Sequence, residues 1–250
     1  MLHYQIQGEG PAWVFLHGFL ESSTMWHALT LAELPIQCIF IDLPGHGASE
    51  LPDGNPSIQA MALEVEKVLQ AELIDKFTVV GHSMGAYVGL ELSRLKGFEQ
   101  LILLNSNCWS DSEQKKQDRL RVAHLVQHAK LHFIREAIPN LFSNPAQHPF
   151  FIEGLIEEAN CMTPEAIAFA ALAMRERADF TAYVNSKPEQ FTFIHGKLDR
   201  LVSVAELQSK IKGPKIHLLD CGHMAHVEAG KEVLEILKAI LTLHTTFKVF

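Results

Sequence analysis

The amino-acid sequence predicts an α/β protein with a mostly parallel, doubly wound sheet and an inserted helical cap. Six short runs are apolar almost throughout, without a regular polar alternation, as are strands buried on both faces of a parallel sheet. Stretches with apolar residues three or four positions apart lie between most of these runs and predict helices. The alternation of strand and helix favours one sheet with right-handed crossovers.

The predicted elements follow this alternation along the chain. The predicted strands are Ala12–Leu16, Cys38–Ile41, Phe77–Val80, Leu101–Leu104, Phe191–Ile194 and Ile216–Leu219, and His3–Gln7 is expected to add an antiparallel edge strand. The helices between them are expected at Ser57–Leu73, Gly85–Leu95, Val204–Ile211 and Val227–Leu243.

Residues 110–183 interrupt this alternation of strands and helices and contain no strand-like run. They are expected to form the helices Glu113–Lys130, His132–Ile138, Pro149–Asn160 and Pro164–Arg177. A helical insertion between two strands would lie over the carboxyl edge of the sheet. The predicted organisation is therefore a core of residues 1–109 and 184–250 with a cap of residues 110–183.

Composition and charge exclude several classes of protein. The chain has 250 residues, of which 48% are hydrophobic and 20% charged, so it is too apolar for a disordered chain. Its length is sufficient for a large core without disulfides. With a net charge of −8, the chain lacks the strongly basic character that is typical of proteins that bind nucleic acid or an anionic membrane.

The compartment is predicted from the cysteines and the first residues. Residues 1–11 have no basic segment followed by an apolar run, so no signal peptide is expected. No stretch approaches the ~18 apolar residues of a membrane span. The four cysteines are scattered, with no CxxC pair, which favours a reducing compartment. We expect a cytoplasmic protein without membrane or nucleic-acid partners.

The strongest chemical signal is the segment Gly81-His82-Ser83-Met84-Gly85. It directly follows a predicted strand and directly precedes a predicted helix, which is the context that the G-x-S-x-G motif requires. Small residues at both ends allow a sharp turn that exposes the serine on a strained backbone. The helix behind it directs free N–H groups toward whatever the serine attacks. Ser83 is the predicted nucleophile.

A serine nucleophile needs a base, and the base needs an orienting carboxylate. Both are expected after later strands, in the order serine, acid, histidine. Asp199 follows one late strand and is the predicted acid. His223 and His226 follow the last strand, and on the residues alone either is a candidate base.

Five segments in this order resemble the α/β-hydrolase superfamily, in its small esterase-like branch. They are His17-Gly18-Phe19, Asp42-Leu43-Pro44-Gly45-His46-Gly47, Gly81 to Gly85, Gly196 to Asp199, and Gly222-His223 with Glu228 just behind. The resemblance runs almost from end to end of the chain. It implies an α/β-hydrolase fold, with Asp199 as the acid and His223 as the base.

The resemblance also implies the groups that stabilise the oxyanion. One donor is the backbone N–H of Met84, the residue after the nucleophile, and the other is the backbone N–H of Phe19. His17 is expected to fix the surrounding loop by hydrogen bonds, and residues 42–47 to form a turn at the floor of the site. No metal, nucleotide or flavin is expected.

The substrate pocket is expected beneath the cap, whose aromatic and methionine side chains suit an apolar acyl or aryl group. The pocket candidates are His82, Phe133, Phe142, Met162, Met174 and His226. The charged cluster at the start of the cap contains Lys115, Lys116, Arg119 and Arg121 beside Asp111, Glu113 and Asp118. We expect solvated ion pairs there, with recognition of a substrate carboxylate as the alternative.

Three histidines, His124, His128 and His132, lie four residues apart on a predicted cap helix. Two such histidines bind zinc when a carboxylate joins them, but no HExxH sequence is present. An exposed helix face is therefore expected here, and no metal site.

These observations predict a serine hydrolase that cleaves small carboxylic esters, or similar acyl bonds, through an acyl-enzyme. Carbon–carbon bond hydrolysis, lactone hydrolysis and pyruvate elimination are alternatives on the same triad. The last is the reaction of the menaquinone-pathway lyase, whose histidine loop is similar to residues 222–226. A ligand receptor with a vestigial site is the alternative of another class. The sequence leaves open the natural substrate and the choice between monomer and homodimer.

Overall fold

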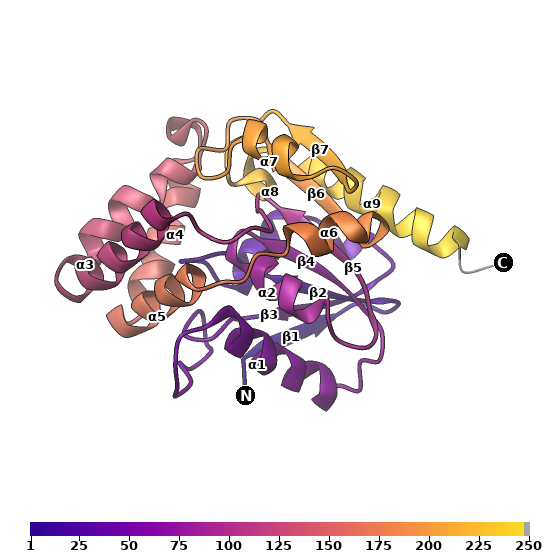
Figure 1. Cartoon of the computed structure of the whole chain (residues 1–250), viewed down its shortest axis with the longest axis horizontal. Coiled ribbons are helices and arrows are strands. Elements are labelled where there is room, and N and C mark those ends of the chain that lie inside the picture. The colour runs from indigo at the N-terminus through magenta and orange to yellow at the C-terminus, as the bar shows by residue number, and fades with distance from the viewer. Residues whose placement is uncertain (248–250) are drawn as a thin grey trace.

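The computed structural model describes residues 1–247 and contains a seven-stranded sheet in the order β1-β3-β2-β4-β5-β6-β7 (Figure 1). The strands are β1 (Tyr4–Gln7), β2 (Ala12–Leu16), β3 (Gln37–Ile41), β4 (Phe77–His82), β5 (Phe98–Leu104), β6 (Phe191–Gly196) and β7 (Lys215–Leu219). Only β1 runs antiparallel, pairing with β3 at the edge of the sheet, and the other pairs are parallel. The predicted fold class is confirmed.

Successive strand residues point to opposite faces of the sheet, and both faces are covered. Val14 and Leu16 of β2 pack into one buried cluster, whereas Trp13 and Phe15 pack into another. Because a side chain on either face is buried, every position of the strand is apolar. This explains why the strand signal in the sequence is continuous rather than alternating.

Three helices cover the first face and the C-terminal helices cover the second. The first face packs against α1 (Ile58–Ala71), α2 (Met84–Leu92) and α7 (Val204–Lys210). The second packs against α8 (Ala225–Glu228), α9 (Gly230–Phe247) and the short 3-10 helix η1 (Ser23–Ala28), with a further turn at η2 (Leu31–Glu33). None of the helices within residues 1–247 has the length and apolar character needed to cross a membrane.

The inserted block contains α3 (Glu113–Ala137), α4 (Pro149–Cys161), α5 (Pro164–Arg175) and the start of α6 (Thr181–Ser186). The 3-10 turns η3 (Pro139–Leu141) and η4 (Pro145–Gln147) join α3 to α4, and η5 (Pro188–Gln190) precedes β6. Figure 1 shows α3, α4 and α5 gathered at one side of the sheet. Together with the turns between them, they share a third buried apolar cluster, which also contains Leu20 and Met224 of the core.

Two details differ from expectation. The predicted helices 113–130 and 132–138 form one helix, α3, with a kink where Ala129 has non-helical backbone angles (φ −141°, ψ 41°). A single non-helical residue redirects the axis without ending the helix, because helical geometry resumes immediately. The expected boundary between 183 and 184 falls inside α6, whose Val184 packs with the sheet.

Candidate active site

The turn between β4 and α2 holds Ser83 in a conformation that is strained for a side-chain-bearing residue. Its backbone has φ +48° and ψ −111°. A Cβ at Gly81 would lie 2.5 Å from the backbone of Ala86, and one at Gly85 would lie 2.2 Å from the Leu16 carbonyl oxygen. Glycine is therefore required on both sides of Ser83 for the turn to close, as the sequence pattern predicted.

The backbone of Ser83 is fixed while its hydroxyl stays available. Its N–H donates to the carbonyl of Leu104 (3.0 Å), and its carbonyl accepts from the Ser106 hydroxyl (2.8 Å). The Ser83 side chain makes no capping hydrogen bond to α2. The serine hydroxyl thus stands at the positive end of a buried helix, held by neighbouring strand ends.

Asp199 and His223 form a buried pair at the same edge of the sheet. Nδ1 of His223 lies 2.8 Å from Oδ2 of Asp199, and both side chains are almost fully buried. The other carboxylate oxygen accepts from the backbone N–H groups of Leu201 (2.8 Å) and Val202 (3.1 Å). Burial opposes ionisation of Asp199, but the contact with the His223 ring and the other hydrogen bonds to the carboxylate outweigh it and hold the pKa of the carboxyl below its usual range.

The loop that carries His223 is tied to three other segments. The His223 N–H donates to the carbonyl of Leu141 (2.8 Å), and the Gly222 carbonyl accepts from the Asn105 side chain (2.9 Å). The Glu228 carboxylate accepts from the Gly222 N–H (2.7 Å) and from the Ser143 N–H (2.8 Å). Leu141 and Ser143 belong to the inserted block, so the block and the histidine loop are joined directly.

Ser83 and His223 line one cavity of about 440 Å³. Among residues 1–247, no hydrogen bond joins the Ser83 hydroxyl to the His223 ring. The apolar part of the wall is formed by Phe19, Leu20, Val122, Phe133, Ala137, Leu141, Met174, Leu201 and Val202. The volume is within the range of small-molecule sites.

Two backbone N–H groups, those of Phe19 and Met84, have no acceptor among the described residues. Met84 is the first residue of α2, so its N–H has no acceptor within the helix. Phe19 lines the cavity, and its N–H donates to no other described residue. The neighbouring His17 fixes this loop as expected, because its ring contacts the Gly18 carbonyl (2.8 Å) and accepts from the Leu43 N–H (2.8 Å).

Three of the six predicted pocket residues, His82, Phe133 and Met174, line this cavity. Phe142, Met162 and His226 are not among the residues that line it. Phe142 stacks on His148, and both Phe142 and Met162 are buried in the apolar cluster that joins α3, α4 and α5. His226 is buried behind His82 and packs against Trp26, with ring centroids 6.2 Å apart. These side chains hold elements together rather than facing substrate.

Comparison with known proteins identifies the family. Residues 13–236 match the family described as "Alpha/beta hydrolase family". This chain belongs to the alpha/beta hydrolase family.

Relatives of this alpha/beta hydrolase include more than one activity. It is 26% identical to a 2-succinyl-6-hydroxy-2,4-cyclohexadiene-1-carboxylate synthase from Salmonella agona, over 97% of this chain and 100% of the synthase. Its structure is similar to that of a thermophilic esterase from Thermogutta terrifontis, with a TM-score of 0.88, 29% identity, and coverage of 96% of this chain and 93% of the esterase. MenH from S. aureus shares the fold, with a TM-score of 0.84, 20% identity, and coverage of 98% and 100%.

The charged cluster of this alpha/beta hydrolase divides between solvent and the cavity. Exposed pairs join Lys116 to Glu113 and Arg121 to Asp118, each at 2.7 Å. The other members, Asp111, Lys115 and Arg119, line the cavity, as do Asp118 and Arg200. The expectation of solvated pairs is therefore right for only part of the cluster.

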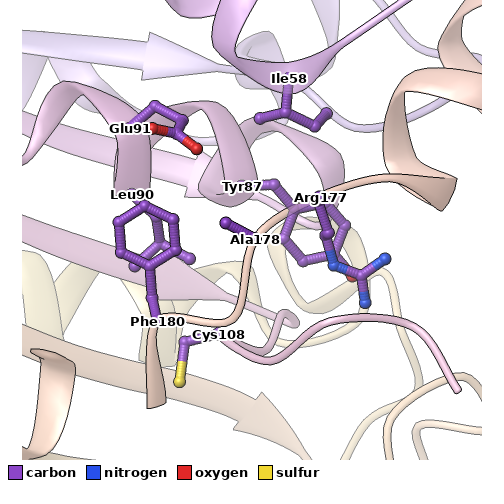
Figure 2. A pocket seen from close by; sticks show the side chains of 8 residues that line it. All are labelled: Ile58, Tyr87, Leu90, Glu91, Cys108, Arg177, Ala178 and Phe180. Atoms are coloured by element: carbon purple, nitrogen blue, oxygen red, sulfur yellow. The ribbon is translucent and has the colours of Figure 1, made fainter. Parts of the chain in front are cut away.

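Tyr87 forms part of the cavity wall and is supported from behind. The Arg177 guanidinium lies 4.2 Å from the centre of the Tyr87 ring and pairs with Asp111 at 2.7 Å. Figure 2 shows Tyr87 and Arg177 beside one another, with Cys108 and Phe180 nearby. The space between these four residues and Ile58, Leu90, Glu91 and Ala178 has no room for a water molecule.

Sequence reasoning missed several residues that shape the site. Asn105 donates to Asp199 at 3.1 Å and comes directly after β5, so its position at a strand end was a usable signal. Glu21 is a buried carboxylate in the loop after β2, and only its acidity within an otherwise neutral stretch marked it. Tyr87, Asn107 and Arg200 gave no signal that distinguishes them from ordinary structural residues.

Buried histidines surround the site without forming a metal centre. Within residues 1–247, no three or more His, Cys, Asp or Glu side chains are grouped to hold a metal ion. Burial lowers the pKa of His46 and of His226, the neighbouring His17 and His82 rings act in the same direction, and both pKa values fall to about 3. Neither ring nitrogen of His226 has a hydrogen-bond partner among the described residues. Both histidines are therefore neutral in the folded protein.

The free energy of unfolding is expected to fall as the pH drops from 6.5 to 4.5. The unfolded chain binds a proton at His226 near pH 6.5, whereas the folded chain does so only near pH 3. Each such histidine destabilises the fold by about 1.4 kcal/mol per pH unit in this interval. His226→Leu is expected to reduce the slope by that amount in urea unfolding at pH 6.5, 5.5 and 4.5. An unchanged slope would contradict the assignment.

Proposed function

We propose that this alpha/beta hydrolase is a serine hydrolase that cleaves small carboxylic esters through an acyl-enzyme on Ser83. The observation that carries the proposal is the lining of the cavity. Ser83, on a strained turn and with a free hydroxyl, lines the same cavity as His223, whose ring is oriented by the buried Asp199 carboxylate. A nucleophile, a base and an orienting acid on three separate strand ends are the parts required for acyl transfer.

His223 is the proposed base. Its Nδ1 is occupied by Asp199, which leaves Nε2 to take the proton of Ser83 as the hydroxyl attacks the ester carbonyl. The hydrogen bond between them forms as substrate binds, since catalytic hydrogen bonds are often long in unliganded enzymes. His223 then protonates the leaving alcohol, and water attacks the acyl-enzyme with His223 again as base. Asp199 stabilises the charged ring throughout.

The N–H groups of Phe19 and Met84 are the proposed oxyanion donors. Phe19 lines the cavity and Met84 directly follows Ser83, which also lines it, and neither N–H is committed to another acceptor among the described residues. Each donor of this kind is worth roughly 2.7–4 kcal/mol in the transition state. The apolar walls around Phe133 and Met174 favour a short acyl or aryl group. No step in this mechanism requires a metal or an organic cofactor.

A second candidate is elimination of pyruvate on the same triad. Arg119 and Arg200 line the cavity with Ser83, which suits a substrate bearing carboxylates. The 26% identity to the Salmonella synthase favours the same candidate. Arg121 and Arg175 give it no support, because neither is among the residues that line the cavity and each is paired with a carboxylate, Asp118 and Glu176 respectively. Ester cleavage is preferred because most of the cavity wall is apolar and Arg119 is already paired with Asp111 (3.3 Å).

The decisive experiment combines a covalent probe with a substrate panel. A fluorophosphonate is expected to label the protein once, on the peptide that contains Ser83. The p-nitrophenyl esters of acetate, butyrate and longer acids are assayed beside a carbon–carbon meta-cleavage product, a lactone and the synthase substrate, with pyruvate release measured for the last. Turnover confined to the synthase substrate would select the lyase, and absence of labelling would favour a ligand receptor.

A further inference from the structure

A buried ion pair lies beside the candidate nucleophile and lines the same cavity. Nδ1 of His82, the residue before Ser83, is 2.8 Å from Oε2 of Glu21, and each side chain is only 1% exposed. His82 is the last residue of β4, and Glu21 lies in the loop after β2. Neither side chain is one of the three groups assigned to acyl transfer.

Each member of the pair reaches a different part of the site. Oε2 of Glu21 also accepts from the Gly18 N–H at 2.6 Å, next to the proposed oxyanion donor at Phe19. Nε2 of His82 lies 2.9 Å from the carbonyl oxygen of His223. The pair therefore connects the oxyanion loop to the backbone of the proposed base.

The contacts define where the protons are. A carbonyl oxygen only accepts, so Nε2 of His82 carries a proton that it donates to His223. Nδ1 faces a carboxylate oxygen that already accepts from Gly18, so Nδ1 is a donor as well. Burial alone would lower the pKa of His82, but the charge of Glu21 raises it. Burial likewise opposes ionisation of Glu21, yet the charge of His82 lowers its pKa to about 2.

The Glu21–His82 pair binds two backbone groups that the other hydrogen bonds around His223 leave free. Leu141 accepts from the His223 N–H, and Asp199 binds the ring. The carbonyl of His223 is held by His82, and the Gly18 N–H is held by Glu21. The pair packs closely against Gly18, where a Cβ would lie 2.4 Å from Oε2 of Glu21 and 2.8 Å from Nδ1 of His82.

We propose that Glu21 and His82 are positioning residues. They hold the loop that contains Gly18 and Phe19 and the backbone of His223 in fixed positions relative to one another for acyl transfer. The proposal rests on the proposed function. A displacement of about 1 Å at catalytic groups costs on the order of 10²-fold in rate, so two loops held by one ion pair have a large effect on turnover. Neither residue gives or takes a proton in the reaction itself.

Glu21→Gln tests the proposal with almost no change of shape. In the native protein one oxygen, Oε2, accepts from both Gly18 and His82. A neutral His82 has a single proton, so beside the introduced amide it loses either the bond to that side chain or the bond to the His223 carbonyl. We expect kcat for p-nitrophenyl butyrate to fall by about 10- to 100-fold, with KM within about twofold. Val68→Ala, buried in α1 on the first face of the sheet, controls for loss of stability.

Nitrogen-15 NMR of histidine-labelled protein supplies a readout that does not need turnover. Because His82 contacts a carboxylate at Nδ1 and a carbonyl at Nε2, it is expected to carry protons on both ring nitrogens in the native protein and on one in Glu21→Gln. The Nδ1 proton of His223 is expected to exchange faster with water in Glu21→Gln than in the native protein or Val68→Ala. This exchange rate decides the positioning role even if the native protein hydrolyses no ester, a result that would defeat only the proposed function.

Two results would overturn the proposal. One is a Glu21→Gln protein whose kcat matches that of Val68→Ala although His82 has lost its second proton. The other is a His223 Nδ1 proton that exchanges at the native rate in Glu21→Gln.

Discussion

Ser83→Ala is expected to lower kcat for p-nitrophenyl butyrate by about 10⁶-fold. The hydroxyl is the only part of Ser83 removed, and it makes no capping hydrogen bond to α2. The backbone bonds to Leu104 and Ser106 remain, so the turn keeps its shape. Activity above the uncatalysed rate then comes from the N–H groups of Phe19 and Met84 and from binding alone. The measurement is steady-state turnover, with fluorophosphonate labelling as a second readout.

Ser209→Ala is the matched control for this variant. The Ser209 hydroxyl is exposed on α7 and donates to the Glu206 carbonyl at 2.7 Å, so its loss is expected to leave turnover and labelling unchanged. Thermal unfolding of both variants is expected to resemble that of the native protein. Ester turnover that persists undiminished in a folded Ser83→Ala protein would refute the nucleophile assignment.

The sequence was sufficient to predict the positions where chemistry concentrates, because parallel strands end at a common edge. Ser83 follows β4, Asp199 follows β6 and His223 follows β7, and these strands share one sheet. Strand order and strand ends therefore predict that these residues lie close together. The Asp199–His223 contact at 2.8 Å agrees with this prediction. Their catalytic roles stay proposals until the variants are measured.

The pocket was harder to predict because it depends on how helices pack. Phe133 and Phe142 both read as apolar residues of the inserted block, but Phe133 faces the cavity and Phe142 is buried among α3, α4 and α5. The orientation of each side chain follows from the kink at Ala129 and the turns after it, which local spacing does not encode. Long-range contacts also decide the position of Arg119, which pairs with Asp111 at the cavity rather than in solvent.

Glu21 illustrates a different limit of sequence reasoning. A carboxylate three residues after Gly18 is unremarkable in a loop, and its importance appears only when β4 brings His82 to within 2.8 Å of it. Buried charges of this kind are costly unless they are paired. The presence of such a pair beside the nucleophile is what motivates a role beyond packing.

Asp199→Asn is expected to lower kcat by about 10⁴-fold. Oδ1 of Asp199 accepts from the Leu201 and Val202 N–H groups, and an asparagine oxygen is expected to keep these bonds. Its NH₂ group then faces Nδ1 of His223, which in the native protein is a donor to Oδ2. Two donors repel, so His223 is driven to the tautomer with its proton on Nε2. That nitrogen is then unable to accept the proton of Ser83, although all three side chains remain close to their native positions.

Asp220→Asn tests whether loss of a carboxylate in this region is by itself harmful. Asp220 lies next to the histidine loop, but its side chain is 86% exposed and pairs with Lys197 at the surface. Turnover of Asp220→Asn is therefore expected to match that of the native protein. Nitrogen-15 NMR is expected to show the His223 proton on Nδ1 in Asp220→Asn and on Nε2 in Asp199→Asn. If kcat of Asp199→Asn fell by less than tenfold and His223 were still protonated at Nδ1, another group would have to orient the base.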